Sequence, residues 1–137
     1  MFKGFLLMCA LPLSSCAIGA APDPSSLPPD ATYDIASEYT ILSDCTYRRL
    51  DQIWLHGPGG HAGDLRKTDL PSERTSRLVY WYQIVDQPAH EWQIDFHGVG
   101  KNTTLVTFHK AFGAAPWADT NLTSEIIPGI LNDCSRN

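Results

Sequence analysis

Two histidines and one aspartate are the residues best placed to do chemistry, because strand alternation puts them on one side of a sheet. His97 lies two residues after Asp95, and His109 has the matching parity on the next predicted strand. Two imidazoles and one carboxylate can ligate zinc or iron. In simple hairpin registers, however, His109 falls opposite Glu91 or Gln93, away from His97. We therefore predict no metal site, and keep small-ligand or metal binding as the alternative function.

A glycine-rich loop, 57–63, is the second feature that could bind a ligand. His56 and His61 flank its Gly57-Pro58-Gly59-Gly60 stretch, which lacks the Gly-Lys-Ser/Thr of a phosphate loop and the spacing of a dinucleotide fingerprint. The chain also lacks the Gly-x-Ser-x-Gly turn of a nucleophilic serine, and its carboxylates are scattered. We predict no catalytic residue, no cofactor and no enzymatic activity.

Residues 1–15 have the layout of a secretory signal peptide. Lys3 gives a basic start, and 5–13 form an apolar run that is too short for a membrane-spanning helix of ~20 residues. Leu13-Ser14-Ser15-Cys16 comes directly after this run. In sequence and position it resembles the lipobox of bacterial envelope lipoproteins.

The resemblance implies cleavage before Cys16 and attachment of acyl chains, palmitate among them, to that cysteine. Two or more chains give stable membrane anchoring. Ala17 occupies the position where an aspartate would indicate inner-membrane retention, so the resemblance implies an outer-membrane lipoprotein that faces the periplasm. Ordinary cleavage after Ala20 is the alternative, and it would give a secreted or soluble periplasmic protein.

Residues 16–33 read as a lipid-anchored, proline-rich tether, and 34–137 as one domain. Four prolines lie between positions 20 and 31, which favours an extended spacer of ~3 Å per residue. The chain is 43% hydrophobic and 18% charged, as in ordinary globular proteins. Its formal charge of -5 and its lack of a long basic run argue against nucleic acid as a partner.

Cys45 and Cys134 are the cysteines that remain after the signal is removed and Cys16 is lipidated. An even pair in an oxidising compartment predicts a disulfide. Helical spacing predicts a helix over 37–51, capped by Ser37, and a second one near the C-terminus. Each cysteine lies on the apolar side of its helix, so we expect the bond to link the two helices.

Three strands are predicted between the helices, over 76–86, 91–97 and 104–112. Residues 87–90 are predicted to form a turn, and the second strand alternates, with Trp92, Ile94 and Phe96 on one side. Short connections make the three strands an antiparallel meander. The fold class is therefore α+β: a two-layer sandwich of helix, three-stranded meander and helix, with one disulfide linking the helices. Residues 52–55 are a possible further short strand, and the charged segment after them reads as a loop.

A sheet with both helices on one face leaves the other face open. The favoured facing turns Tyr80, Tyr82 and Ile84 inward; the opposite one buries Trp81. The open face would then present aromatic and aliphatic side chains beside polar ones such as Asp95 and Thr107, unless the tether or residues 52–75 cover it. Such a surface is typical of a partner site. We expect a non-enzymatic accessory lipoprotein that binds another envelope protein through Val79, Trp81, Val85, His97 and His109.

Overall fold

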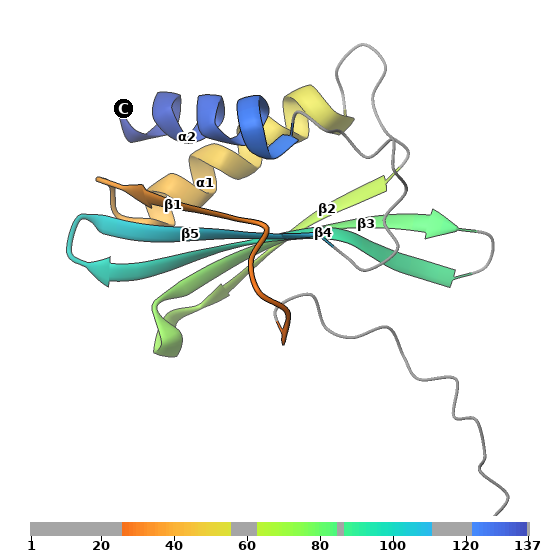
Figure 1. Cartoon of the computed structure of the whole chain (residues 1–137), viewed down its shortest axis with the longest axis horizontal. Helices are drawn as coiled ribbons and strands as arrows, with labels where there is room; N and C mark the ends of the chain where they lie inside the picture. Colours follow the sequence, from red (N-terminus) through yellow and green to blue (C-terminus); the bar gives the residue numbers. More distant parts are fainter. Residues whose placement is uncertain (1–25, 56–62, 85–86, 111–121, 137) are drawn as a thin grey trace, which may run out of the picture.

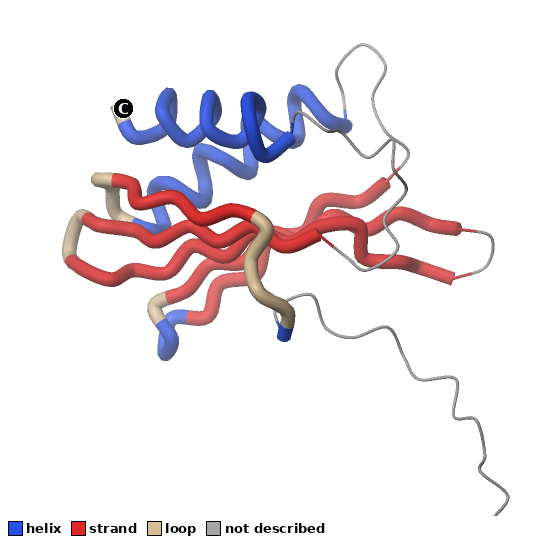
Figure 2. Tube along the Cα trace, in the orientation of Figure 1, coloured by secondary structure: helices blue, strands red, loops and turns tan. Residues whose placement is uncertain are grey.

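The computed structural model describes residues 26–55, 63–84, 87–110 and 122–136. They form a five-stranded antiparallel sheet in the order β1-β5-β4-β3-β2, with the α-helices on one side of it (Figure 1, Figure 2). The elements are β1 (Ala31–Ile35), α1 (Tyr39–Leu50), β2 (Gly63–Leu70), β3 (Thr75–Ile84), β4 (Gln87–Gly100), β5 (Thr103–Lys110) and α2 (Ile127–Ser135). The α+β class is confirmed. The predicted three-stranded meander is wrong, because β1 and β2 extend the sheet at both edges.

The residue that caps helix α1 lies one position later than predicted. Glu38, rather than Ser37, caps the helix: its carboxylate accepts the backbone N–H groups of Thr40 and Ile41 at 3.0 and 3.1 Å. These bonds satisfy two of the donors that every helix N-terminus leaves unpaired. Further along, apolar and small residues recur on the side that packs against the sheet, namely Leu42, Ser43, Thr46 and Leu50.

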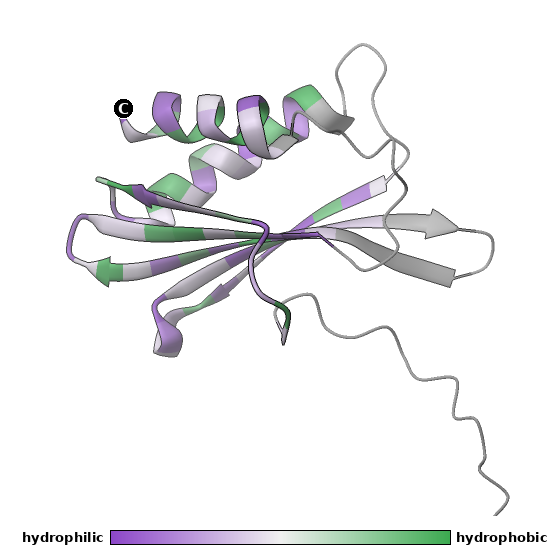
Figure 3. Ribbon diagram, viewed as in Figure 1, coloured by the Kyte–Doolittle hydropathy of each residue, from purple (hydrophilic) through white to green (hydrophobic). Residues whose placement is uncertain are grey.

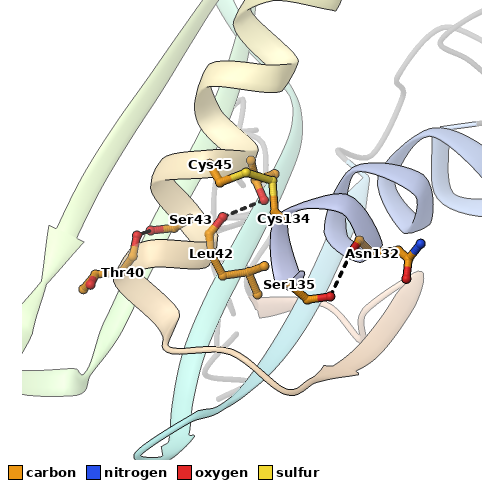
Figure 4. Close-up of a disulfide and its surroundings, with 8 residues drawn as sticks. Thr40, Leu42, Ser43, Cys45, Asn132, Cys134 and Ser135 are labelled. Carbon is orange, nitrogen blue, oxygen red and sulfur yellow. Dashed lines mark hydrogen bonds between the residues drawn. A yellow bond between two sulfur atoms is a disulfide. The ribbon is translucent and has the colours of Figure 1, made fainter. Parts of the chain in front are cut away.

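Helix α2 lies beside α1 and is bonded to it covalently. Pro128 stands in its first turn, where the missing N–H costs no helical hydrogen bond. The predicted disulfide between Cys45 and Cys134 is confirmed, with the Cα atoms 5.7 Å apart (Figure 4). It joins residues separated by 89 positions. Closing such a loop stabilises the fold by about 4 to 5 kcal/mol in the chain-entropy model.

Strands β3, β4 and β5 lie where strands were predicted, with boundaries that differ by a few residues. Strand β4 begins at Gln87, so the predicted turn over 87–90 is wrong. The predicted alternation in β4 is confirmed, since Trp92, Ile94 and Phe96 are buried beneath the helices. In β3, Tyr80 is fully buried, as the favoured facing required.

Strand β1 begins at Ala31, so residues 31–33, which we assigned to the tether, pair with β5. Tyr33 and Ile35 turn toward the core. The Tyr33 hydroxyl donates a 2.6 Å hydrogen bond to the carbonyl of Thr123, just ahead of α2. Burial raises the pKa of this tyrosine above its ordinary value. Strand β1 therefore connects the sheet edge to the helix layer.

Residues 63–70 form strand β2, where the sequence was interpreted as a loop. Leu65 is its buried apolar residue. On the same side, Lys67 lies 2.9 Å from a carboxylate oxygen of Asp44 on α1 and 2.6 Å from one of Asp69. Hydrogen bonds from Lys67 and Ser76 lower the pKa of Asp69. Strand β2 is therefore held in place by one apolar side chain, Leu65, and by polar contacts with α1 and β3.

The predicted short strand over 52–55 is wrong. Asp51–Leu55 instead continues α1 as a wide, π-helical turn. The backbone of Asp51 keeps helical angles (φ -57°, ψ -46°), and its N–H bonds to the carbonyls of Arg48 and Tyr47. The aromatic and β-branched composition of this segment therefore did not decide its conformation, since the preceding helix extends into it.

The aromatic part of the core comes from β3, β4 and β5. The rings of Tyr80 and Trp92 stack with centroids 5.3 Å apart, and Phe108 lies 6.1 Å from Trp92. Gly63 permits this packing, because a Cβ atom at this position would lie 2.3 Å from the Tyr80 ring. The glycine of β2 is therefore required by the close approach of the tyrosine.

Candidate functional site

The open face is the side of the sheet that turns away from the α-helices (Figure 1). Cross-strand pairing places Arg77 opposite Asp95, and Gln93 between Val79 and His109. In Figure 3, polar and apolar residues alternate along the strands, as expected when the two sides of a sheet have different neighbours. The predicted partner-binding residues on the open face are Val79, Trp81, His97 and His109, whereas Val85 lies outside the described residues.

A buried ion pair forms the centre of the open face. Asp95 is only 3% exposed, although both described α-helices lie on the other side of the sheet. Arg77 holds both of its carboxylate oxygens, with Nε–Oδ1 and Nη2–Oδ2 distances of 2.7 and 3.2 Å. Gln93 donates a 2.8 Å hydrogen bond to Oδ2 from the other side. Forked bonding of this kind fixes three side chains in one geometry.

His97 connects the strands on either side of β4. Its Nδ1 atom lies 3.0 Å from Oγ1 of Thr75 on β3, and its Nε2 atom lies 3.5 Å from Oγ1 of Thr107 on β5. Both ring nitrogens therefore have a hydroxyl neighbour. The imidazole acts as a cross-strand link, and its lone pair faces a threonine instead of an open coordination position.

His109 lies away from His97, as the hairpin registers predicted. It pairs with Gln93, whereas His97 pairs with Leu105. The ring is 6% exposed, and its Nδ1 atom has no hydrogen-bond partner within the described part of the chain. In residues 26–55, 63–84, 87–110 and 122–136, no three His, Cys, Asp or Glu side chains come together in a group that could hold a metal ion.

Apolar and polar side chains share the open face. Val79, Trp81 and Leu105 are each half-buried, and the middle of the face is polar. The register accounts for this polar middle, since it sets Arg77 directly beside Asp95.

Trp81 is the large aromatic side chain of this face whose surroundings are described. The guanidinium carbon of Arg66 lies 5.8 Å from the centroid of its ring, a cation–π distance. Asp64 holds that arginine in turn, with 2.6 Å between Nε and Oδ2. The indole is therefore restrained on one side while part of its surface stays accessible.

The edges of the sheet offer little for strand addition. Strand β2 has charged side chains at Asp64, Arg66, Lys67 and Asp69, and β1 is only five residues long. Charges and short length are the features by which proteins protect sheet edges from further pairing. A partner of this domain would therefore meet the face of the sheet more readily than its edge.

Comparison with known proteins finds no family model, no curated protein and no solved structure that matches this chain. Within the described ranges, no helix is both long enough and apolar enough to span a bilayer. The arrangement of the chain's own side chains is therefore the basis for assigning a function.

Proposed function

We propose that this chain is a non-enzymatic accessory lipoprotein of the bacterial cell envelope that binds another envelope protein through its open face. The observation that supports this most is the combination at that face: a fixed polar centre of Arg77, Asp95 and Gln93 on the same face as the half-buried ring of Trp81. Interface cores commonly combine a large aromatic side chain with groups whose geometry is set before binding.

The size of the open face suits a protein partner. Five strands at about 4.8 Å spacing and about 26 Å in length cover roughly 600 Å² in projection. A standard interface buries about 800 Å² on each partner, which is of the same order. A small molecule would need a concave site around most of its surface, whereas a broad sheet face suits a protein.

Trp81 would contribute most to the binding free energy. Tryptophan and arginine are the residues most often found at interface hot spots. Here Arg66 already lies over the indole and is itself held by Asp64. Little side-chain entropy would then be lost on binding, because both side chains are restrained before a partner arrives.

Affinity capture of the full-length, membrane-associated chain tests the proposal. Trp81→Ala should lower recovery of the main envelope partner at least tenfold, while Trp81→Phe should retain most of it. Ile53→Ala, which trims another exposed apolar residue, is the matched control and should bind normally. Normal capture by Trp81→Ala would contradict the proposal. Loss of function with His97→Ala and His109→Ala alone would favour the ligand or metal alternative.

Lipid attachment is tested separately at Cys16. Cys16→Ala should move the protein from the membrane fraction to the soluble fraction or leave it unprocessed, because no acyl chain can then be attached. Fractionation and gel mobility are the readouts. Behaviour identical to that of the unchanged chain would show that Cys16 does not hold the anchor.

A further inference from the structure

A hollow of about 460 Å³ lies on the helix side of the molecule, beside the disulfide. We name it the disulfide hollow; its lining residues are Ile41, Cys45, Arg48, Arg49, Gln52 and Cys134. In Figure 4, the bridge lies between the middle of α1 and the end of α2. Cys134 is 1% exposed, so the half-buried Cys45 presents the bridge to the hollow.

The chemistry of this lining is apolar and positive. Ile41 is 59% exposed, which is unusual for a large aliphatic side chain and makes it accessible beside the sulfur atoms. Arg48 and Arg49 supply two positive charges, and no aspartate or glutamate among the described residues lines the hollow. The lining thus combines one apolar contact surface with two guanidinium groups.

The two arginines differ from the paired cations of the sheet. Arg66, Lys67 and Arg77 each have a carboxylate within 2.7 Å. No such ion pair is formed by Arg48 or Arg49 with any residue in the described ranges. Because the chain as a whole has a formal charge of -5, two unpaired arginines at one hollow form a local region of opposite sign.

We propose that the disulfide hollow binds a segment of a partner protein in which an aliphatic or aromatic residue adjoins Asp or Glu. The apolar side chain would pack on Ile41 and the disulfide, and the carboxylate would pair with Arg48 or Arg49. Arginine matches a carboxylate through two parallel N–H bonds, so the hollow selects for this anion as well as for its charge.

A free inorganic anion fits the hollow less well. Such an anion would pair with the arginines but would leave Ile41 and the disulfide without an apolar partner. The hollow is also open to solvent, so it would not enclose a small ligand. A peptide segment overcomes both effects, because apolar contact with Ile41 adds to the ion pairs.

The test is photo-cross-linking in the full chain within its native cells. A benzophenone amino acid at position 41 should cross-link to a partner segment in which Asp or Glu lies within two residues of an apolar side chain. Arg48→Glu with Arg49→Glu should lower the yield at least tenfold, and Arg48→Lys with Arg49→Lys should retain much of it. The same probe at position 53, another half-exposed isoleucine outside the hollow, should not give this product.

The control for the change in net charge is Lys101→Glu with Lys110→Glu, which alters the charge by the same amount at residues outside the hollow. This variant should leave the cross-linking yield unchanged. The proposal is overturned by no product at position 41, by a product only with lipid or a second copy of this chain, or by equal yields with Arg48→Glu and Arg49→Glu.

This site is independent of the open face. Trp81→Ala should leave the product at position 41 intact. If open-face capture fails while that product forms, the proposed function is wrong and the disulfide hollow stands. If capture through the open face is observed but no product forms at position 41, the proposed function stands and the proposal for the hollow is wrong.

Discussion

The two faces of the sheet bury side chains of the same strands in different ways. On the helix side, Trp92, Ile94 and Phe96 are buried by apolar packing. On the open side, residues of the same strand, Gln93 and Asp95, are 1% and 3% exposed, yet hydrogen bonds and an ion pair hold them. The comparison teaches that the sheet face turned away from the helices can be ordered without being apolar. Order on the open face depends on geometry, and order beneath the helices depends on contact area.

The largest expected effect is at Trp92, in the packed face. Trp92→Ala should lower the free energy of unfolding by about 3 to 5 kcal/mol, because it leaves a cavity between Tyr80 and Phe108. Denaturant unfolding measures it. Trp81→Ala is the matched control on the other face and should cost less than about 1 kcal/mol. Equal losses of unfolding free energy in the two variants would show that the two faces do not differ in packing.

The second effect is at the ion pair of the open face. Asp95→Ala should cost about 3 kcal/mol, because it leaves Arg77 partly buried without its carboxylate. Replacing both residues, Arg77→Met with Asp95→Leu, should cost less than the single change, since no uncompensated charge remains. If the double variant loses as much stability as Asp95→Ala or more, the uncompensated charge of Arg77 is not the cause of the loss.

A smaller effect is expected at Gly63, where backbone and ring approach each other. Gly63→Ala should cost about 1 to 3 kcal/mol, because the added methyl group would displace the Tyr80 ring. Gly129→Ala, in α2, is the control: nothing lies within 4 Å of its Cβ position. It should be neutral or slightly stabilising, since alanine favours helix. Near-ultraviolet circular dichroism would report the displaced ring.

The smallest effect concerns pH and the charged contacts of β2. Hydrogen bonds from Lys67 and Ser76 lower the pKa of Asp69, so its contribution is present above about pH 4 and is lost as pH falls. Burial alone would lower the pKa of Lys67, but its bonds to Asp69 and Asp44 outweigh this and raise it. The lysine's contribution is therefore complete below about pH 10 and is lost as pH rises.

Asp69→Asn should reduce the loss of stability between pH 7 and pH 3, by less than about 1 kcal/mol because its side chain is half-exposed. Asp64→Asn, which removes a paired carboxylate from the other side of β2, serves as the comparison. An unchanged acid profile in Asp69→Asn would show that this contact does not contribute to folding.

Periodicity in the sequence was enough to predict the helices and the inward residues of β4, and the even pair of remaining cysteines predicted the disulfide. It failed for β2, because Asp64, Arg66 and Lys67 obscure the alternation and only Leu65 is buried in the core. It also failed for β1, a five-residue strand that directly follows a proline-rich stretch.

The polar centre of the open face depends on relative register. Arg77 and Asp95 are 18 residues apart, and only the pairing of β3 with β4 brings them within 2.7 Å. The disulfide hollow was missed for a similar reason. Each lining residue is ordinary on its own helix, and the hollow exists only where α1 meets α2.

The Cys45–Cys134 bond also determines how the domain would respond to mechanical tension. A pull on the N-terminal end could unravel β1 and the first half of α1, residues 31–44, releasing about 45 Å of extended chain. At Cys45 the pull reaches a branch point, because the sulfur bridge opens a second covalent route into α2. Strands β2 to β5 lie inside the closed loop between Cys45 and Cys134. Tension applied at the N-terminal end would therefore be shared by α1 and α2 before it reached strands β2 to β5.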